Sequence, residues 1–433
     1  MKVLHLSTSD LEGGAARAAY RLHEGLQEIN LSSQMLVRAK SSCDRTVIAE
    51  KSLKSKLGPI LSNLPLRSYP KRDRTLFSLQ WSWDAIAPRV AQLNPDVLNL
   101  HWVSNGYLQI ETLAKLNKPL VWTLQDMWAF TGGCHYSQDC DRYTDSCGKC
   151  PQLHSNKNRD LSRQVWRRKT RAWKNLNLTI VAPSSWMAKC AHSSSLFRSR
   201  PIEVIPFGLD TEKYKPVNPS IARDLLNLPQ DKQLVLFGAL AATSDRRKGF
   251  DLLLPALQKL GESGWQDRFE IAVFGASQPE NPVELGMRTH YLGHFQDDLM
   301  LALAYSAADV MIVPSIQESF GQTASEAMAC GTPVVAFDAT GLSDIVDHQQ
   351  NGYLAKPFEV EDLARGITRV LEDSSRHQKL STLAREKAER EFTLERQARR
   401  YQSVYADILE RCNARDSPTW LQGRSNLVET PTR

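Results

Sequence analysis

The sequence predicts an α/β fold of two doubly wound domains, each with a parallel sheet covered by helices. Short apolar runs alternate with segments of helical periodicity in two successive series, which begin at residues 3–6 and 234–238. The first run is followed by Gly13 and Gly14 and then by an amphipathic helix pattern, the strand, turn and helix unit of such sheets. Between the two series, residues 204–216 carry the Pro and Gly residues of a linker.

The other strands of both domains are expected at further short apolar runs. In the first domain these runs are residues 34–37, 97–100, 120–124, 179–182 and 203–205, and in the second they are 271–275, 289–292, 310–313 and 334–337. Apolar residues recur every three to four positions over 380–409, which predicts a long helix. We therefore expect domains at 1–206 and 207–385, a C-terminal helix at 386–412, and a disordered tail at 413–433, where the composition is polar.

Composition indicates a globular chain without a membrane span. Hydrophobic residues make up 42% and charged residues 24% of the 433 positions, which are ordinary values for a soluble protein. No apolar run approaches the roughly 18–20 residues that cross a bilayer, and the N-terminus lacks the long apolar region of a signal peptide. The expectation is a cytoplasmic protein.

Positive charge is concentrated in the first half of the chain. The net charge is +6, but residues 1–210 hold 29 Lys and Arg against 17 Asp and Glu. Much of this excess lies in residues 51–74, where basic residues are interleaved with leucines and an isoleucine. Such a segment either lies on an anionic bilayer surface or forms a solvated helix and loop. Nucleic-acid binding is not favoured, because no recognised binding motif accompanies the charge.

Two carboxylates flank a glycine turn in the second half of the chain. Glu318 and Glu326 lie eight residues apart, and a helix should begin between them near residues 320–323, where Thr323-x-x-Glu326 fits a capping box. The start of a helix attracts anions, so a diphosphate could lie there while the carboxylates accept hydrogen bonds from hydroxyls. Glu326 alone could be only a capping residue. Together these features describe a nucleotide-sugar site.

Residues 309–356 resemble family 4 of the retaining glycosyltransferases (group 1). The resemblance rests on the run Glu318-Ser-Phe-Gly, on Gly331-Thr-Pro-Val-Val and on Asn351-Gly-Tyr-Leu, and it extends from residue 1 to about 410. It implies the GT-B fold, in which two Rossmann-like domains face each other across a cleft and the last helix crosses back to the first domain. It also implies transfer of a sugar from a nucleotide-sugar donor to an acceptor alcohol with retention of configuration.

The resemblance also assigns donor-binding residues. Lys248, between a strand and a helix, would contact the diphosphate. The family commonly has Gly-Arg where this chain has Gly238 and Ala239, so Arg246 or Arg247 would replace the missing arginine, unless backbone groups bind the phosphate instead. In the same way, Glu326 would bind the ribose and Glu318 the sugar hydroxyls. The backbone of Phe320, Gly321 and Gln322, together with Gly14 and His294, would complete the donor site.

On the acceptor side, a departure from the family affects the candidate catalytic residues. Residues 126–136 resemble a subgroup that builds exopolysaccharide and O-antigen chains, but that subgroup commonly has His-Asp where this chain has Gln125 and Asp126. Gln cannot take a proton, although it can hydrogen-bond a sugar hydroxyl. In a retaining mechanism the leaving phosphate can accept the proton itself. Asp126 is otherwise the nearest base, and His101 is either an alternative or a buried histidine at a strand end.

Four of the eight cysteines cluster in a short polar loop. Cys134, Cys140, Cys147 and Cys150 follow a C-x5-C-x6-C-x2-C pattern that suits a structural zinc ion. Reduced cysteines or a disulfide are the alternatives. No cofactor is expected to be required for catalysis.

Two other functions fit the same sequence. Gln125 and Ala239 would also suit a catalytically silent sugar-binding homologue, and the fold alone would suit a nucleotide-sugar epimerase. The preferred prediction is a transferase acting in polysaccharide or glycolipid biosynthesis. Its acceptor would be a sugar or a lipid-linked sugar, and the enzyme would work in the cytoplasm or on the inner face of the plasma membrane.

Overall fold

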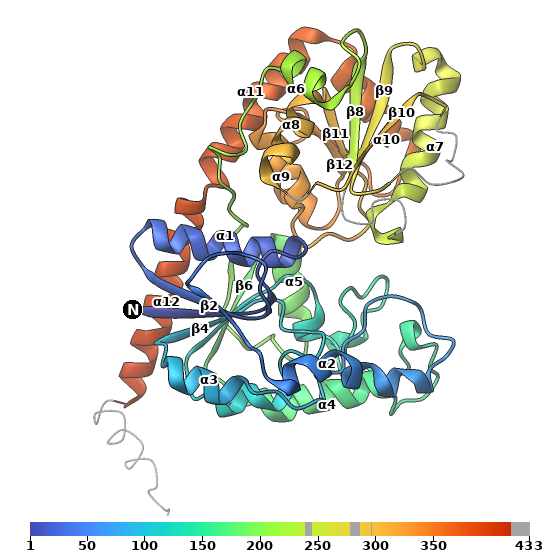
Figure 1. Ribbon diagram of the computed structural model, residues 1–433. Helices are drawn as coiled ribbons and strands as arrows, with labels where there is room; N and C mark the ends of the chain where they lie inside the picture. The colour runs from blue at the N-terminus through green and yellow to red at the C-terminus, as the bar shows by residue number, and fades with distance from the viewer. Residues whose placement is uncertain (239–244, 278–285, 296, 417–433) are drawn as a thin grey trace, which may run out of the picture. The chain divides into compact units, whose positions relative to one another are not determined.

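The computed structural model describes residues 1–238, 245–277, 286–295 and 297–416 (Figure 1). The chain forms two compact units. The first contains Met1–Val181, Cys190–Ile205 and the chain from Ala398 onward, and the second contains Ala182–Lys189 and Pro206–Gln397. Each unit is built around a sheet of parallel strands with helices, so the predicted two-domain α/β class is confirmed.

The first unit is organised around a seven-stranded sheet with the order β3-β2-β1-β4-β5-β6-β7. Its strands are β1 (Lys2–Ser9), β2 (Ser32–Ala39), β3 (Val47–Ala49), β4 (Val97–Leu100), β5 (Leu120–Thr123), β6 (Leu178–Ala182) and β7 (Ile202–Val204). Neighbouring strands from β2 through β1, β4 and β5 to β6 pair in parallel. They read as continuous apolar runs because helices cover both faces of such a sheet.

Helices lie on both faces of this sheet. The helices that belong to the first unit wholly or in part are α1 (Gly14–Glu28), α2 (Leu53–Asn63), α3 (Ile86–Leu93), α4 (Leu161–Trp173), α5 (Ser185–Ser193) and α12 (Leu394–Asp416). Figure 1 shows α1 on one face and α3 and α4 on the other. Tyr401 and Tyr405 of α12 pack into the same core as Val3 of β1, and the Asn99 amide donates to the Tyr405 hydroxyl at 2.7 Å. The C-terminal part of α12 therefore completes the α1 face of the first unit.

The second unit is organised around a six-stranded sheet with the order β10-β9-β8-β11-β12-β13. Its strands are β8 (Gln233–Gly238), β9 (Phe269–Phe274), β10 (Thr289–Gly293), β11 (Val310–Val313), β12 (Val334–Phe337) and β13 (Gly352–Ala355). The helices are α6 (Pro219–Leu226), α7 (Phe250–Leu260), α8 (Asp298–Ala307), α9 (Gln322–Ala329), α10 (Val360–Leu371) and α11 (Ser374–Glu391). In a parallel sheet with β8 at the reversal of strand order, ligands bind beyond the carboxyl ends of the strands.

The predicted long helix over 380–409 is wrong in one respect, because it is interrupted. Helix α11 ends at Glu391 and α12 begins at Leu394. Between them, the Phe392 carbonyl accepts a hydrogen bond from the Leu209 backbone at 2.8 Å, and Thr393 forms a β-bridge with Leu209. These contacts take up backbone groups that a continuous helix would use. Helix α12 also runs past the expected end at residue 412, and residues 417–433 of the expected tail lie outside the described residues.

Candidate functional site

Glu318 is the centre of a charged cluster at the carboxyl end of β11. Its Oε2 atom lies 2.6 Å from Nζ of Lys248 and 3.7 Å from Nη1 of Arg247, and Ser315 approaches it at 3.5 Å. Burial raises the pKa of Glu318, but the charges of Lys248 and Arg247 outweigh this effect and hold the pKa below its ordinary value. The carboxylate is therefore ionised at neutral pH. The cluster joins three of the residues that the sequence assigned to the donor.

A glycine with a left-handed backbone places Lys248 beside Glu318. Gly249 has φ +74°, and a Cβ there would lie 1.8 Å from the Pro314 carbonyl oxygen. This close approach joins the turn that carries Lys248 to the end of β11. The Ile316 backbone then donates to the Arg247 carbonyl at 2.8 Å, which fixes the two loops together.

Gly249→Ala is expected to lower the free energy of unfolding by about 2–4 kcal/mol, because the new Cβ meets a backbone oxygen and the left-handed conformation disfavours alanine. Urea unfolding of the purified protein measures the change. Gly264→Ala is the matched control, since Gly264 has φ +83° but a Cβ added there would meet no atom within 4 Å. A loss for Gly249→Ala no larger than that for Gly264→Ala would contradict the importance of the close approach.

Helix α9 begins earlier than the predicted capping box requires. Its N-cap is Gly321, with φ +116°, and no side chain caps it, so Thr323 lies inside the helix. The capping-box prediction is wrong because Glu326 is buried instead, at 5% exposure, where it accepts a hydrogen bond from the Tyr305 hydroxyl at 2.9 Å. The backbone of Gly341 also approaches the loop before α9 and donates to the Glu318 carbonyl at 3.0 Å.

The other predicted donor residues lie in different surroundings. Phe320 is buried and its ring packs against Phe207, with centroids 5.3 Å apart, so the Phe320 side chain is part of the core. Gln322 is the first residue of α9. His294 is exposed, after the end of β10. Gly14 begins α1 in the first unit. Ala239, the site of the expected missing arginine, lies outside the described residues.

In the first unit, His101 and Gln125 come together at the carboxyl ends of β4 and β5. The Gln125 side-chain nitrogen lies 3.4 Å from Nδ1 of His101, and both side chains are largely buried. His101 also lies 2.9 Å from His5 of β1. Burial is the largest cause that lowers the pKa of His101, to about 3, so this ring is neutral at physiological pH.

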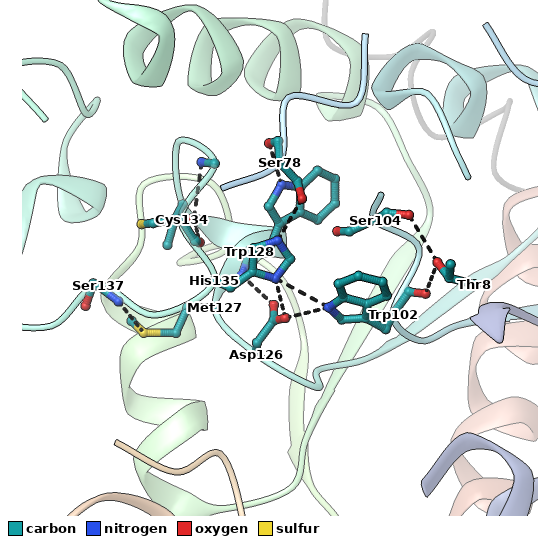
Figure 2. Close-up of polar contacts among 12 residues, drawn as sticks. Thr8, Ser78, Trp102, Ser104, Asp126, Met127, Trp128, Cys134, His135 and Ser137 are labelled. Atoms are coloured by element: carbon teal, nitrogen blue, oxygen red, sulfur yellow. Dashed lines mark hydrogen bonds and ion pairs between the residues drawn. The ribbon is translucent and has the colours of Figure 1, made fainter. Parts of the chain in front are cut away.

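Asp126 accepts hydrogen bonds from several neighbouring donors (Figure 2). Its Oδ2 atom accepts from Nε1 of Trp102 at 2.8 Å and lies 2.5 Å from Nδ1 of His135. Its Oδ1 atom accepts from the Trp128 backbone at 2.8 Å. The second nitrogen of His135 lies 2.8 Å from the Ser78 hydroxyl. This environment holds the Trp102 and His135 rings in place.

Sequence reasoning missed His135 and Lys169. His135 stands nine residues after Asp126 in the chain, but nothing in the spacing showed that the two would pair. Lys169 is fully buried, where its side-chain nitrogen donates to the Trp128 and Thr131 carbonyls and lies 3.6 Å from the Trp128 ring centroid. The only signal for Lys169 is its place on the apolar side of a helix that is otherwise strongly basic.

The four clustered cysteines are free thiols that line one small cavity, of about 20 Å³. Burial raises the pKa of Cys147 to about 12 and that of Cys150 to about 11, so these two thiols are protonated at neutral pH. Among the described residues, no three or more His, Cys, Asp or Glu side chains are arranged to hold a metal ion. The structure thus contains no formed zinc site at these residues, and zinc binding stays a prediction that metal analysis of the reduced protein would decide.

The chain matches two family models and several curated proteins. Residues 222–387 match glycosyl transferases group 1, and residues 12–213 match glycosyltransferase family 4. D-inositol 3-phosphate glycosyltransferase from Xylanimonas cellulosilytica is 36% identical over 228 residues, which are 49% of this chain and 53% of that protein. The relative of the same name from Mycolicibacterium smegmatis is 36% identical, over 40% of this chain and 41% of its own length. The chain thus spans about half the length of the curated relatives it matches.

Solved structures show the same fold at low sequence identity. Sucrose-phosphate synthase from Thermosynechococcus elongatus superposes with a TM-score of 0.68 at 21% identity, over 95% of this chain and 100% of that one. Anabaena HepE in complex with UDP superposes with a TM-score of 0.63 at 18% identity, over 94% and 100% of the two chains. With one family model on each half of the sequence and the GT-B fold throughout, the chain belongs to family 4 of the group 1 glycosyltransferases.

Proposed function

We propose that the protein is a retaining glycosyltransferase, which moves a sugar from a nucleotide-sugar donor to an acceptor alcohol. The observation that carries the proposal is the cluster of Lys248, Arg247 and Glu318 at the carboxyl end of β11, just before α9. Two cations suit a diphosphate, and a buried ionised carboxylate suits sugar hydroxyls. The fold neighbour HepE was solved with UDP and with UDP-glucose, which supports a nucleotide sugar as the donor class.

In this proposal the second unit binds the donor. Lys248 leaves its ion pair with Glu318 and contacts the diphosphate, where its charge stabilises the departing nucleotide. Glu318 then accepts hydrogen bonds from the donor sugar, and Glu326 accepts from the ribose. The leaving phosphate takes the proton of the acceptor alcohol. Gln125, in the first unit, orients a sugar hydroxyl.

Lys248→Ala is expected to weaken binding of the nucleoside diphosphate by about 1–3 kcal/mol, since a charged hydrogen-bond partner is lost. Calorimetry with UDP, GDP and ADP first identifies the diphosphate that binds and then measures the variant. Lys259→Ala is the control, because Lys259 of α7 also pairs with a glutamate, Glu361 of α10, but the two side chains are 48% and 64% exposed. Equal affinities for wild type and Lys248→Ala would reject the donor assignment. Transfer to an acceptor, rather than isomerisation of the sugar, separates the proposal from an epimerase.

We also propose that the exposed surface around α2 contacts an anionic membrane, as expected for a lipid-linked acceptor in polysaccharide or glycolipid biosynthesis. Ile60 is 65%, Leu76 53% and Trp83 70% exposed, and Arg67 and Lys71 are exposed beside them in the chain. Exposed apolar groups with neighbouring cations suit the inner face of a plasma membrane. No described helix has the length and apolar character needed to cross a bilayer.

The double variant Ile60→Ser with Trp83→Ser is expected to abolish cosedimentation with phosphatidylglycerol vesicles, while phosphatidylcholine vesicles bind neither protein. Leu225→Ser is the control, since Leu225 is 62% exposed but lies in the second unit. Equal sedimentation of wild type with both kinds of vesicle, or with neither, would favour the alternative of a solvated helix and loop.

A further inference from the structure

Three buried histidines of the first unit form one continuous hydrogen-bond chain. His101, after β4, lies with its Nε2 atom 2.9 Å from Nδ1 of His5 in β1. Nε2 of His5 lies 3.0 Å from the Ser33 hydroxyl, which is also 2.7 Å from Nδ1 of His23 in α1. Nε2 of His23 lies 2.8 Å from the Thr46 hydroxyl. Every nitrogen of the three rings except Nδ1 of His101 thus has a partner within this chain.

All three rings are neutral, so each has one N–H donor and one acceptor nitrogen. Burial is the largest cause that lowers the pKa of each ring. The hydrogen bonds along a chain of such rings must therefore all run in the same sense, with every donor on one side of its acceptor or every donor on the other. The direction is decided by a group at one end that can only donate or only accept.

That group is Asp44. Its carboxylate is ionised, since hydrogen bonds from the side chain and backbone of Thr46 outweigh the effect of burial and lower its pKa. The Thr46 hydroxyl has a single hydrogen and donates it to Oδ1 of Asp44 at 2.6 Å. The Thr46 oxygen must therefore accept from Nε2–H of His23, as it also accepts from the Gln27 amide at 3.1 Å.

The remaining bonds follow from this one. Because Nε2 of His23 carries the hydrogen, its Nδ1 accepts, and the Ser33 hydroxyl donates to it. The Ser33 oxygen then accepts from Nε2–H of His5, and Nδ1 of His5 accepts from Nε2–H of His101. Nδ1 of His101 is left as an acceptor at the carboxyl edge of the sheet.

Gln125 donates the hydrogen bond that Nδ1 of His101 accepts. Its amide nitrogen lies 3.4 Å from Nδ1 of His101, and the reverse orientation would place two acceptors against each other. The amide oxygen of Gln125 accepts no hydrogen bond from the described residues, and it is not among their buried unpaired polar atoms, so it retains contact with solvent. This oxygen can bind only a hydrogen-bond donor.

We propose that the chain from Asp44 to His101 is a positioning device that fixes the Gln125 amide, so that its oxygen selects a substrate hydroxyl that donates a hydrogen bond. His101, His5 and His23 are positioning residues, and Gln125 is the residue that contacts substrate. The identity of the ligand as a sugar hydroxyl rests on the proposed function, whereas the direction of the chain does not.

The direction is measured by NMR of protein labelled with ¹⁵N-histidine at pH 7. Long-range ¹H–¹⁵N correlations distinguish a ring nitrogen that bears hydrogen from one that accepts. His5, His23 and His101 are each expected to bear hydrogen on Nε2 only, and spectra of His→Gln variants assign the three rings. A hydrogen on Nδ1 of His101, or an imidazolium signal from any of the three, would overturn the proposal. This measurement needs no substrate, so its outcome does not depend on the proposed function.

Ser33→Ala cuts the chain without touching Gln125. It is expected to raise KM for the acceptor alcohol about three- to tenfold, the effect of one weakened hydrogen bond, with donor KM unchanged. Ser62→Ala is the control, since Ser62 is also 4% exposed and its hydroxyl also pairs with a buried side chain, that of Ser82 at 2.8 Å. An unchanged acceptor KM, or equal effects of the two variants, would overturn the positioning role. Absence of any transfer in the wild type would reject the proposed function instead, and the NMR result would still decide the direction of the chain.

Discussion

Acidification from pH 6.5 to 5 is expected to lower the free energy of unfolding by about 2 kcal/mol through His101 alone, with further losses from His5 and His23. The folded-state pKa of His101 is lowered to about 3, first by burial and then by repulsion from His23 once that ring is protonated in acid. The unfolded chain therefore binds more protons than the folded one below pH 6.5. This stability is complete above pH 6.5 and is lost as the pH falls toward 3.

Urea unfolding at a series of pH values between 7 and 5, above the range in which most carboxylates titrate, measures this loss. His101→Gln is expected to flatten the pH dependence, because the variant has no ring to protonate at that position. His154→Gln is the control, since the His154 side chain is 54% exposed. If His101→Gln and wild type lose the same free energy over this range, the buried neutral ring is not the cause.

Asp126→Asn is expected to lower the free energy of unfolding by about 3–5 kcal/mol, while turnover of the folded protein falls less than tenfold. The amide nitrogen of Asn cannot accept, so either the Trp102 indole and the His135 ring or the Trp128 backbone lose their acceptor. The carboxylate is occupied by these donors, which argues against a role as general base. Unfolding curves and turnover at saturating donor measure the two effects.

If Asp126 were the general base, Asp126→Asn would give a different result. Loss of a general base would reduce turnover by about 10²–10⁴-fold with little change in stability or donor affinity. Asp84→Asn is the matched control, because Asp84 also accepts three hydrogen bonds, from the backbone of Ile86 and Gln109 and from the Thr112 hydroxyl. A collapse in turnover for Asp126→Asn alone would establish Asp126 as the base.

Most strands could be predicted because helices cover both sheets, and such strands are short, continuous apolar runs. The predicted run 97–100 coincides with β4, and 310–313 coincides with β11. Two edge strands were not predicted. β3 has only three residues, Val47–Ala49, and β13 begins with Gly352, which carries little strand signal. The break before α12 depends on Leu209, which is distant in sequence from Phe392, so no local pattern could reveal it.

The candidate site also has features that the sequence revealed and features that depend on contacts between residues distant in sequence. Lys248 and Glu318 were identified by resemblance to a family, and the structure adds that they form an ion pair across 70 residues of sequence. The sequence could not predict the histidine chain, since His5 and His101 are 96 residues apart. The hydrogen-bond environment of Asp126 was also hidden, because a carboxylate looks the same in a sequence whether it is free or surrounded by donors.

The first unit is assembled from separate stretches of the chain, and this limits how the gene can be recombined. Tyr405 of α12 hydrogen-bonds Asn99, and Tyr401 lies 2.9 Å from the Thr123 hydroxyl, so residues beyond 397 fill the core beneath β4 and β5. A chimera that exchanges only residues 1–205 with a homologue would combine a new sheet with the old α12. Functional hybrids should therefore arise when the same homologue supplies both residues 1–205 and the residues beyond 397.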